Sequence, residues 1–262
     1  MQSVTIDDVV LHYADEGPRD GPALVFSNSL GTDFRVWDLM MPYLPTGWRI
    51  IRYDKRGHGL SSLPDGPWSI ADHAGDLAGL LDHLGVSNAV ICGLSVGGLI
   101  AQQLVQVRPD LMRAMILMDT AAKIGTEEIW APRISAIEAG GLEAIRDANM
   151  TRWFTAAFRD DPARIGPWNA MLTRTPQDGY LRTVGAILGA DFRAFAPGID
   201  LPCLAMCGAD DGSTPPDLVR GTAEMIPGCR FEMIAEAGHL PCVEQPEHVA
   251  GLIAGFVAGL RD

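Results

Sequence analysis

One short run of the sequence restricts the fold more than any other, the pentapeptide G-L-S-V-G at residues 93–97. An apolar stretch at 89–92 precedes it, and an amphipathic stretch at helical spacing, 97–107, follows at once. A strand that passes directly into a helix needs a sharp turn whose central residue has a strained backbone. Such a turn places the Ser95 hydroxyl at a helix N-terminus, where unpaired N–H groups favour negative charge. The alternative is that Ser95 only caps the helix.

Short β-branched runs alternate with helical patterns along most of the chain. We expect strands at 2–6, 9–14, 23–28, 49–53, 88–92, 113–118, 201–206 and 230–234. We expect helices at 35–44, 69–84, 97–107, 215–226 and 246–260. Buried strands that alternate with helices predict an α/β fold, with a mostly parallel eight-stranded sheet and helices on both faces.

The alternation stops between residues 123 and 196. This stretch is helical in pattern, is rich in tryptophan and phenylalanine, and contains no convincing strand. At 74 residues it is long for one crossover connection, which normally needs a dozen or more residues. We therefore expect a helical cap at 123–196 inserted into a core formed by 1–122 and 197–262. Ordinary crossover helices are the alternative.

Composition narrows the partners of this 262-residue chain. Its net charge of −13 argues against nucleic acid and anionic membranes as partners. The cap holds nine Lys or Arg and nine Asp or Glu, so the rest of the chain carries the whole negative excess. No apolar run reaches the roughly 18 residues that span a membrane, and the N-terminus does not resemble an export signal. The five cysteines are scattered, which predicts reduced thiols and a cytoplasmic protein without a bound metal.

A serine hydroxyl needs a neighbouring base to become a good nucleophile. Of six histidines, His239 lies in the loop between the last expected strand and the last helix, at the same sheet edge as Ser95. An acid to orient it should follow the preceding strand, where Asp210 and Asp211 compete. We prefer Asp211, three residues after Gly208, with Asp210 as the alternative. The chain order Ser, Asp, His is that of an α/β-hydrolase.

An oxyanion formed at this serine needs two backbone donors. One is expected from Val96, the residue after the nucleophile, and the other from Leu30 in the loop 28–32. Asn28-Ser29 stand where many relatives have His-Gly, which makes the second donor a departure from the common pattern. The stretch 54–61, DKRGHGLS, resembles the D-x-R-G-x-G-x-S signature of the α/β-hydrolase superfamily. We interpret Asp54, Arg56 and His58 as structural residues of a turn.

Within that superfamily the chain is similar to the 3-oxoadipate enol-lactonases. The resemblance rests on five stretches, residues 26–32, 92–98, 120–125, 207–216 and 237–239. It implies a cofactor-free enzyme of the β-ketoadipate pathway that opens an enol-lactone through an acyl-enzyme. The substrate carries an unreactive carboxylate, for which Arg133, close to Trp130 in the cap, is the preferred partner. Trp153 and Trp168 are further pocket candidates.

Other functions fit the same residues. A carboxylesterase or a cofactor-free haloperoxidase or perhydrolase would use the same Ser95, Asp211 and His239. A dehalogenase or epoxide hydrolase fits less well, because these enzymes need an aspartate at position 95. A ligand receptor that kept the fold without catalysis is a more distant alternative. Fold alone does not choose among them, and the sequence leaves the oligomeric state open.

Overall fold

The computed structural model describes residues 1–260, which contain one eight-stranded sheet. Its strands are β1 (Gln2–Ile6), β2 (Val9–Glu16), β3 (Ala23–Ser27), β4 (Arg49–Tyr53), β5 (Ala89–Leu94), β6 (Met112–Met118), β7 (Cys203–Gly208) and β8 (Arg230–Ile234). Their order across the sheet is β1-β2-β4-β3-β5-β6-β7-β8. The β1–β2 and β2–β4 pairs are antiparallel, and the others are parallel. The mostly parallel α/β sheet expected from the sequence is confirmed.

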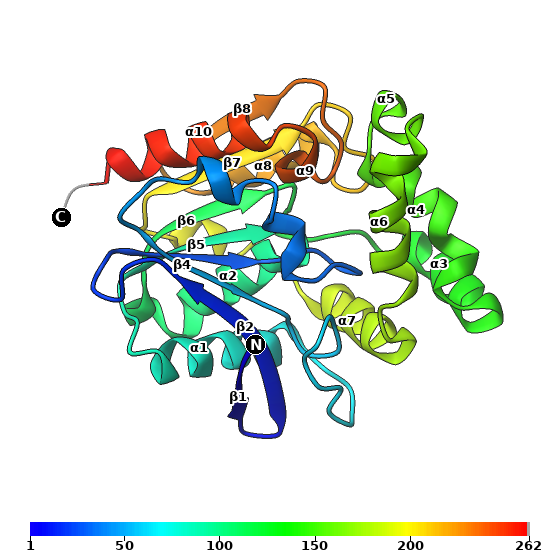
Figure 1. The fold of residues 1–262 in the computed structure, drawn as a ribbon, viewed down its shortest axis with the longest axis horizontal. Helices are drawn as coiled ribbons and strands as arrows, with labels where there is room; N and C mark the ends of the chain where they lie inside the picture. Colours follow the sequence, from blue (N-terminus) through cyan, green and yellow to red (C-terminus); the bar gives the residue numbers. More distant parts are fainter. Residues whose placement is uncertain (261–262) are drawn as a thin grey trace.

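Helices cover both faces of this sheet. Figure 1 shows α1 (Ile70–His83) and α2 (Val96–Val107) below the sheet and α10 (Pro246–Ala258) above it. The remaining core helices are α8 (Pro216–Met225) and the short α9 (Pro241–Glu244). The helix expected at 35–44 is wrong: this segment forms two 3-10 turns, at Phe34–Trp37 and Met41–Tyr43. Pro42 accounts for the difference, because its ring removes an N–H and collides with the carbonyl four residues earlier.

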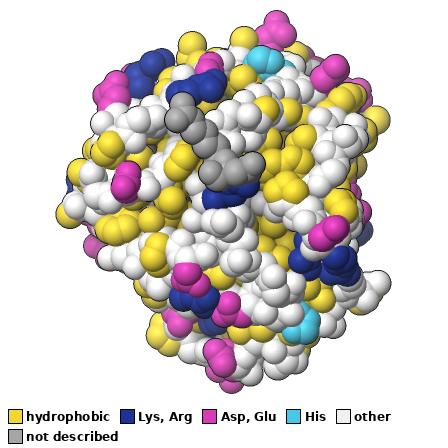
Figure 2. Space-filling view, turned by 90° about the vertical axis from the view of Figure 1, so that its left-hand side faces the viewer, with side chains coloured by type: hydrophobic (Ala, Val, Ile, Leu, Met, Phe, Trp, Pro, Cys, Tyr) yellow, Lys and Arg dark blue, Asp and Glu magenta, His cyan; other side chains and the backbone are white. Residues whose placement is uncertain are grey.

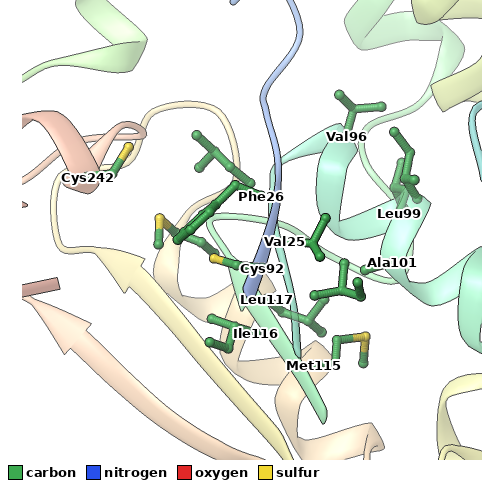
Figure 3. Packing of buried hydrophobic residues seen from close by; sticks show 14 of the residues in the cluster. Val25, Phe26, Cys92, Val96, Leu99, Ala101, Met115, Ile116, Leu117 and Cys242 are labelled. Carbon is green, nitrogen blue, oxygen red and sulfur yellow. The ribbon is translucent and has the colours of Figure 1, made fainter. Parts of the chain in front are cut away.

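Strand register builds the core beneath the site. Phe26, Cys92 and Ile116 are register partners on β3, β5 and β6, and each is completely buried. Because neighbouring residues of a strand face opposite sides, Val25 and Leu117 point toward α2 (Figure 3). The three central strands are therefore apolar on both faces, as a parallel sheet between helices requires.

All the regular structure between β6 and β7 is helical. The segment contains α3 (Glu127–Gly140), α4 (Arg146–Trp153), α5 (Ala156–Arg159), α6 (Pro162–Thr173) and α7 (Gln177–Gly189). Figure 1 shows α3 to α6 beyond the carboxyl ends of the parallel strands, where the loops after β5, β7 and β8 begin. We call residues 123–196 the cap segment; its division from the core as a separate domain stays a prediction.

The surface away from the cap segment is chemically mixed. Figure 2 shows acidic and basic side chains scattered among apolar and neutral ones on that face. Among the described residues that this view shows, the basic side chains form no continuous strip of the kind that follows a nucleic acid backbone. Within residues 1–260, no helix combines the length and the apolar character needed to cross a membrane.

Candidate active site

Ser95 occupies a strained turn between β5 and α2. Its φ is 58° and its ψ is −117°, a conformation that side-chain-bearing residues rarely adopt. A Cβ on Gly97 would lie 2.0 Å from a backbone oxygen of β3, and one on Gly93 would lie 2.2 Å from the Gly97 oxygen. The Ser95 N–H donates to the Met118 carbonyl at 2.9 Å, and the Thr120 hydroxyl donates to the Ser95 carbonyl at 2.6 Å. The turn is thus held on both sides by the end of β6.

Asp211 and His239 form a buried pair at the same edge of the sheet. Asp211 follows β7 and His239 follows β8, and the distance from His239 Nδ1 to Asp211 Oδ2 is 2.9 Å. Asp211 Oδ1 accepts the N–H groups of Ser213 at 2.6 Å and Thr214 at 3.0 Å. The Thr214 hydroxyl donates to Oδ2 at 2.7 Å. Burial alone would raise the pKa of Asp211, but His239 and these donors lower it below its usual range.

The structure separates the two aspartates that the sequence left open. Asp210 is exposed, and its N–H donates to the Ala237 carbonyl at 2.9 Å. Asp211 is only 4% exposed and is the one that contacts the imidazole. The tight loop after Gly208 therefore turns one carboxylate inward and its neighbour out to solvent.

Ser95 and His239 line one cavity of about 180 Å³. Within residues 1–260, the hydrogen bonds of the His239 ring go from Nδ1 to Asp211 and, at 3.4 Å, to the Thr214 hydroxyl. Nε2 is left as the nitrogen available to the Ser95 hydroxyl across the cavity. Catalytic hydrogen bonds are often loose without substrate and tighten when it binds.

A third buried acid, Asp119, lies next to this pair. One ligand atom from each of Asp119, Asp211 and His239 lies within 4.8 Å of the other two. Asp211 already accepts hydrogen bonds from four N–H or O–H groups, and the Cys207 thiol lies 4.0 Å from its Oδ2, which suits a carboxylate fixed in place better than a metal ligand. We therefore do not assign a metal site to this group. The sequence offered no signal for Asp119, because an aspartate after a strand usually belongs to an ordinary turn.

Of the two expected oxyanion donors, Leu30 belongs to the wall of the cavity and Val96 directly follows Ser95. None of the loop hydrogen bonds within residues 1–260 uses the Leu30 N–H. Val96 is the first residue of α2, and the first N–H groups of a helix have no partner inside the helix. Both backbone groups are therefore open to a further acceptor.

The loop that carries Leu30 is held in place by hydrogen bonds to residues of the turn at 54–61. The buried Lys55 ammonium donates to the Ser29 carbonyl at 2.5 Å and to the Thr32 carbonyl at 3.3 Å. The Gly31 N–H donates to His58 Nε2 at 3.1 Å. Burial lowers the pKa of Lys55 to about 7. The burial of Lys55 could not be predicted from the sequence, because a lysine inside a turn motif is usually exposed.

The other turn residues also hold the frame together. Arg56 makes a two-pronged contact with Asp76, with both distances at 2.6 Å. Asp54 accepts the N–H groups of Phe34 and Leu60 at 2.8 and 2.9 Å. None of Asp54, Arg56 and His58 lines the cavity that contains Ser95.

The cap segment contributes two arginines near the cavity. Arg133 lines it, with its guanidinium 4.3 Å from the centre of the Trp130 ring. Arg152 donates to the Asn149 side chain, and Asn149 also lines the cavity. Burial, together with the charge of Arg133, lowers the pKa of Arg152 to about 10. Within residues 1–260, neither arginine is paired with a carboxylate. The sequence could not select Arg152 from the nine cations of the cap.

The tryptophans divide between the cavity and the interior of the cap segment. Trp130 and Trp153 line the cavity, whereas Trp168 packs against Phe154 with ring centres 5.8 Å apart. The backbone of α4 also contacts the loops that follow β7 and β8. The Gly212 N–H donates to the Arg152 carbonyl at 3.2 Å, and the Leu240 N–H donates to the Trp153 carbonyl at 3.3 Å. The cap segment therefore touches both loops that carry Asp211 and His239.

Comparison with known proteins identifies the family of this fold. Residues 22–246 match the family model of the alpha/beta hydrolase fold. The chain is 38% identical to 3-oxoadipate enol-lactonase 2 of Acinetobacter baylyi, over 94% of this chain and 92% of that protein. The crystal structure of the enol-lactonase from Burkholderia xenovorans LB400 superposes with a TM-score of 0.94 at 35% identity, covering 98% of this chain and 100% of that one.

A thermophilic esterase from Thermogutta terrifontis, solved with malate bound, superposes with a TM-score of 0.92 at 28% identity, and each chain is covered completely. The family match spans most of the sequence, and the relatives described above are two enol-lactonases and an esterase. This chain belongs to the α/β-hydrolase family and is a hydrolase.

Proposed function

We propose that this hydrolase opens 3-oxoadipate enol-lactone to 3-oxoadipate, with Ser95 as nucleophile, His239 as general base and Asp211 as the orienting acid. One observation carries the proposal: a buried Asp211–His239 hydrogen bond of 2.9 Å faces the cavity in which Ser95 stands on its strained turn. The choice of substrate rests on the enol-lactonase relatives in sequence and in structure.

The first half of the reaction forms an acyl-enzyme. His239 Nε2 takes the hydroxyl proton while Ser95 Oγ bonds to the lactone carbonyl carbon, and the carbonyl oxygen becomes an oxyanion. The N–H groups of Val96 and Leu30 stabilise that charge. Asp211 keeps the proton of the imidazole on Nδ1 and stabilises the imidazolium. When the ring C–O bond breaks, the leaving enol oxygen takes the proton from His239 and the enol tautomerises to a ketone.

The second half releases the acid. His239 takes a proton from a water molecule, whose oxygen bonds to the acyl carbon and forms a second oxyanion at the same donors. When this intermediate breaks down, the Ser95 oxygen leaves and takes back the proton from His239. The free carboxylic acid product then ionises, and the enzyme returns to its starting state.

The unreactive carboxylate of the substrate is held by the cap segment in this proposal. Arg133 lines the cavity and stacks on Trp130, which fixes its guanidinium without neutralising it. Arg152 adds a second positive charge nearby, and burial and the charge of Arg133 lower its pKa. Within residues 1–260 neither cation has an acidic partner, so the two form a site that a carboxylate can complete.

Turnover of the enol-lactone by the purified protein tests the proposal. Loss of the ultraviolet absorbance of the lactone should be rapid with wild type and absent with Ser95→Ala. Arg133→Ala should raise KM strongly with a smaller change in kcat, because the interaction is made before and during the reaction. An unchanged KM for Arg133→Ala would remove that residue from the substrate site.

A carboxylesterase is the second candidate, supported by the structural likeness to the Thermogutta terrifontis esterase. A panel with a neutral aryl ester, a simple lactone and the enol-lactone separates the two activities. Preference for the aryl ester would overturn the lactonase proposal. A halide oxidation assay with peroxide tests the haloperoxidase alternative, which would use the same catalytic triad of Ser95, His239 and Asp211. Labelling of Ser95 by a fluorophosphonate probe tests for a working nucleophile whatever the substrate, and a protein that bound lactone without labelling would be a receptor.

A further inference from the structure

Asp119 lies at the end of β6 and is completely buried. Its φ is 45°, an uncommon conformation for a residue with a side chain. Its N–H donates to the Met206 carbonyl at 2.9 Å, and its Oδ1 accepts the Gly208 N–H at 2.9 Å. Both partners belong to β7, directly before the loop of Asp211. The neighbouring residues, Met118 and Thr120, hold the turn of Ser95. One short segment therefore touches both the nucleophile turn and the acid loop.

The carboxyl groups of Asp119 and Asp211 lie too close to ionise together. Their oxygens and a ring nitrogen of His239 are within 4.8 Å of one another, and all three residues are buried. Two buried carboxylates that share a site raise the pKa of one of them strongly, because like charges repel where water cannot screen them. The pair therefore keeps one proton near neutral pH.

The hydrogen bonds of the two carboxyl groups indicate that Asp119, and not Asp211, carries the shared proton. Asp211 accepts hydrogen bonds from four N–H or O–H groups and is thus stabilised as an anion. Asp119 Oδ2, by contrast, is buried and has no hydrogen-bond partner within residues 1–260. Burial, followed by the charge of Asp211, raises the pKa of Asp119 well above its usual range. An unpartnered oxygen next to an anion is the position of an acidic O–H.

Within residues 1–260, no lysine or arginine is among the titratable groups that face Asp119. These groups are Asp211, His239, Cys207 and Cys242. Burial raises the pKa of both thiols, so the two cysteines are neutral. The Gly208 N–H and the Cys207 thiol favour the ionised form of Asp119, but burial and the charge of Asp211 outweigh them and raise its pKa.

We propose that Asp119 is a positioning residue, a neutral carboxylic acid that donates its proton to the carboxylate of Asp211 and so fixes that carboxylate against His239. This inference rests on the proposed role of Asp211. A fifth donor limits the rotation of Asp211 and spreads its charge, so the proton stays on His239 Nδ1. Ionisation of Asp119 would replace this donor with a second negative charge beside the triad.

The test compares Asp119→Asn and Asp119→Leu with wild type. Asparagine can still accept the Gly208 N–H and donate an N–H to Asp211, whereas leucine can do neither. The readout is the rate of Ser95 labelling by a fluorophosphonate between pH 6 and 9, which does not depend on the natural substrate. Asp119→Leu should label about tenfold more slowly, the effect of losing one hydrogen bond to a charged group. Asp119→Asn should restore most of the rate.

A spectroscopic measurement reports the proton directly. The infrared difference spectrum between wild type and Asp119→Asn at neutral pH should show the carbonyl band of one protonated carboxylic acid. Asp210→Asn is the matched control, because Asp210 is exposed and lies next to Asp211, and its difference spectrum should show only a carboxylate. Thermal unfolding of each variant checks that it is folded under the assay conditions.

The outcomes separate this inference from the triad proposal. A missing acid band, or wild-type labelling by a folded Asp119→Leu, would overturn the role of Asp119. If Asp211→Asn loses reactivity while Asp119→Leu keeps it, the inference alone fails and the triad stands. Wild-type reactivity of Asp211→Asn would overturn the triad, and the inference with it.

Discussion

The substitution Asp119→Asn should change how the free energy of unfolding depends on pH. In the unfolded chain an aspartate loses its proton near its ordinary pKa of 3.8, whereas in the folded protein burial raises the pKa of Asp119 well above that value. Between these two pKa values the folded state binds one proton more than the unfolded state. The stabilising effect of that proton is complete below the unfolded pKa and declines as pH rises toward the folded pKa.

The magnitude follows from this difference of one proton. A single group in this situation reduces the free energy of unfolding by about 1.4 kcal/mol for each pH unit. In wild type this loss continues for as long as the pH lies between the two pKa values of Asp119. Asparagine does not titrate, so the stability of Asp119→Asn relative to wild type should increase by that amount over the same range. The curves should stop diverging above the folded pKa of Asp119.

Urea denaturation at constant ionic strength measures the effect. Wild type, Asp119→Asn and the control Asp210→Asn are unfolded at pH 5, 6 and 7, and the free energies are extrapolated to water. The control should run parallel to wild type, because the side chain of Asp210 is exposed. Parallel curves for wild type and Asp119→Asn would refute the reasoning, since they would show that Asp119 binds no extra proton in the folded state.

Three further substitutions test the supports of the site. Glu244 accepts the Gly238 N–H at 2.7 Å, next to His239, and the Thr155 N–H at 3.1 Å. Glu244→Gln should lower kcat and destabilise by about 1–3 kcal/mol, because the amide NH2 then faces one of these two N–H groups. Lys55→Met should lower kcat more than it raises KM in steady-state assays. The loop at 28–32, which carries Leu30, loses its hydrogen bonds to Lys55, while the proposed substrate contacts of the cap segment stay. Arg56→Met should destabilise by about 3–5 kcal/mol in urea, because it leaves the buried Asp76 carboxylate unpaired.

Controls make these three results specific. Glu244 also accepts the Thr155 hydroxyl at 2.6 Å, so Thr155→Val separates the link to the cap segment from the link to the histidine loop. Lys55→Arg keeps a positively charged hydrogen-bond donor but replaces the ammonium by a larger, planar guanidinium. A wild-type kcat in both Lys55 variants would contradict the proposal that Lys55 holds the loop at 28–32. For the ion pair, a double variant with Asp76→Leu should recover part of the stability lost in Arg56→Met. No recovery would mean that the loss comes from packing.

The family and the candidate triad could be predicted from local patterns. A glycine-flanked serine between an apolar strand and a helix has few structural solutions, and the parallel sheet brings the loops after its strands to one edge. Asp211 and His239 could therefore be placed near Ser95 before their contacts were known. The helix expected at 35–44 failed for a local reason as well, since apolar spacing was given more weight than Pro42.

The sequence by itself determined the order and type of the main elements, the strained turn of Ser95 and the edge of the sheet where the chemistry is expected, because strand periodicity and glycine sterics are local properties. Only the tertiary structure decided which carboxyl faces His239. It also decided that Lys55 is buried against the loop at 28–32 and that Arg152 lies with Arg133 near the cavity. It also brought Asp119 beside Asp211, 92 positions further along the chain. Burial and charge proximity depend on segments far apart in sequence, and these two quantities set which groups are charged.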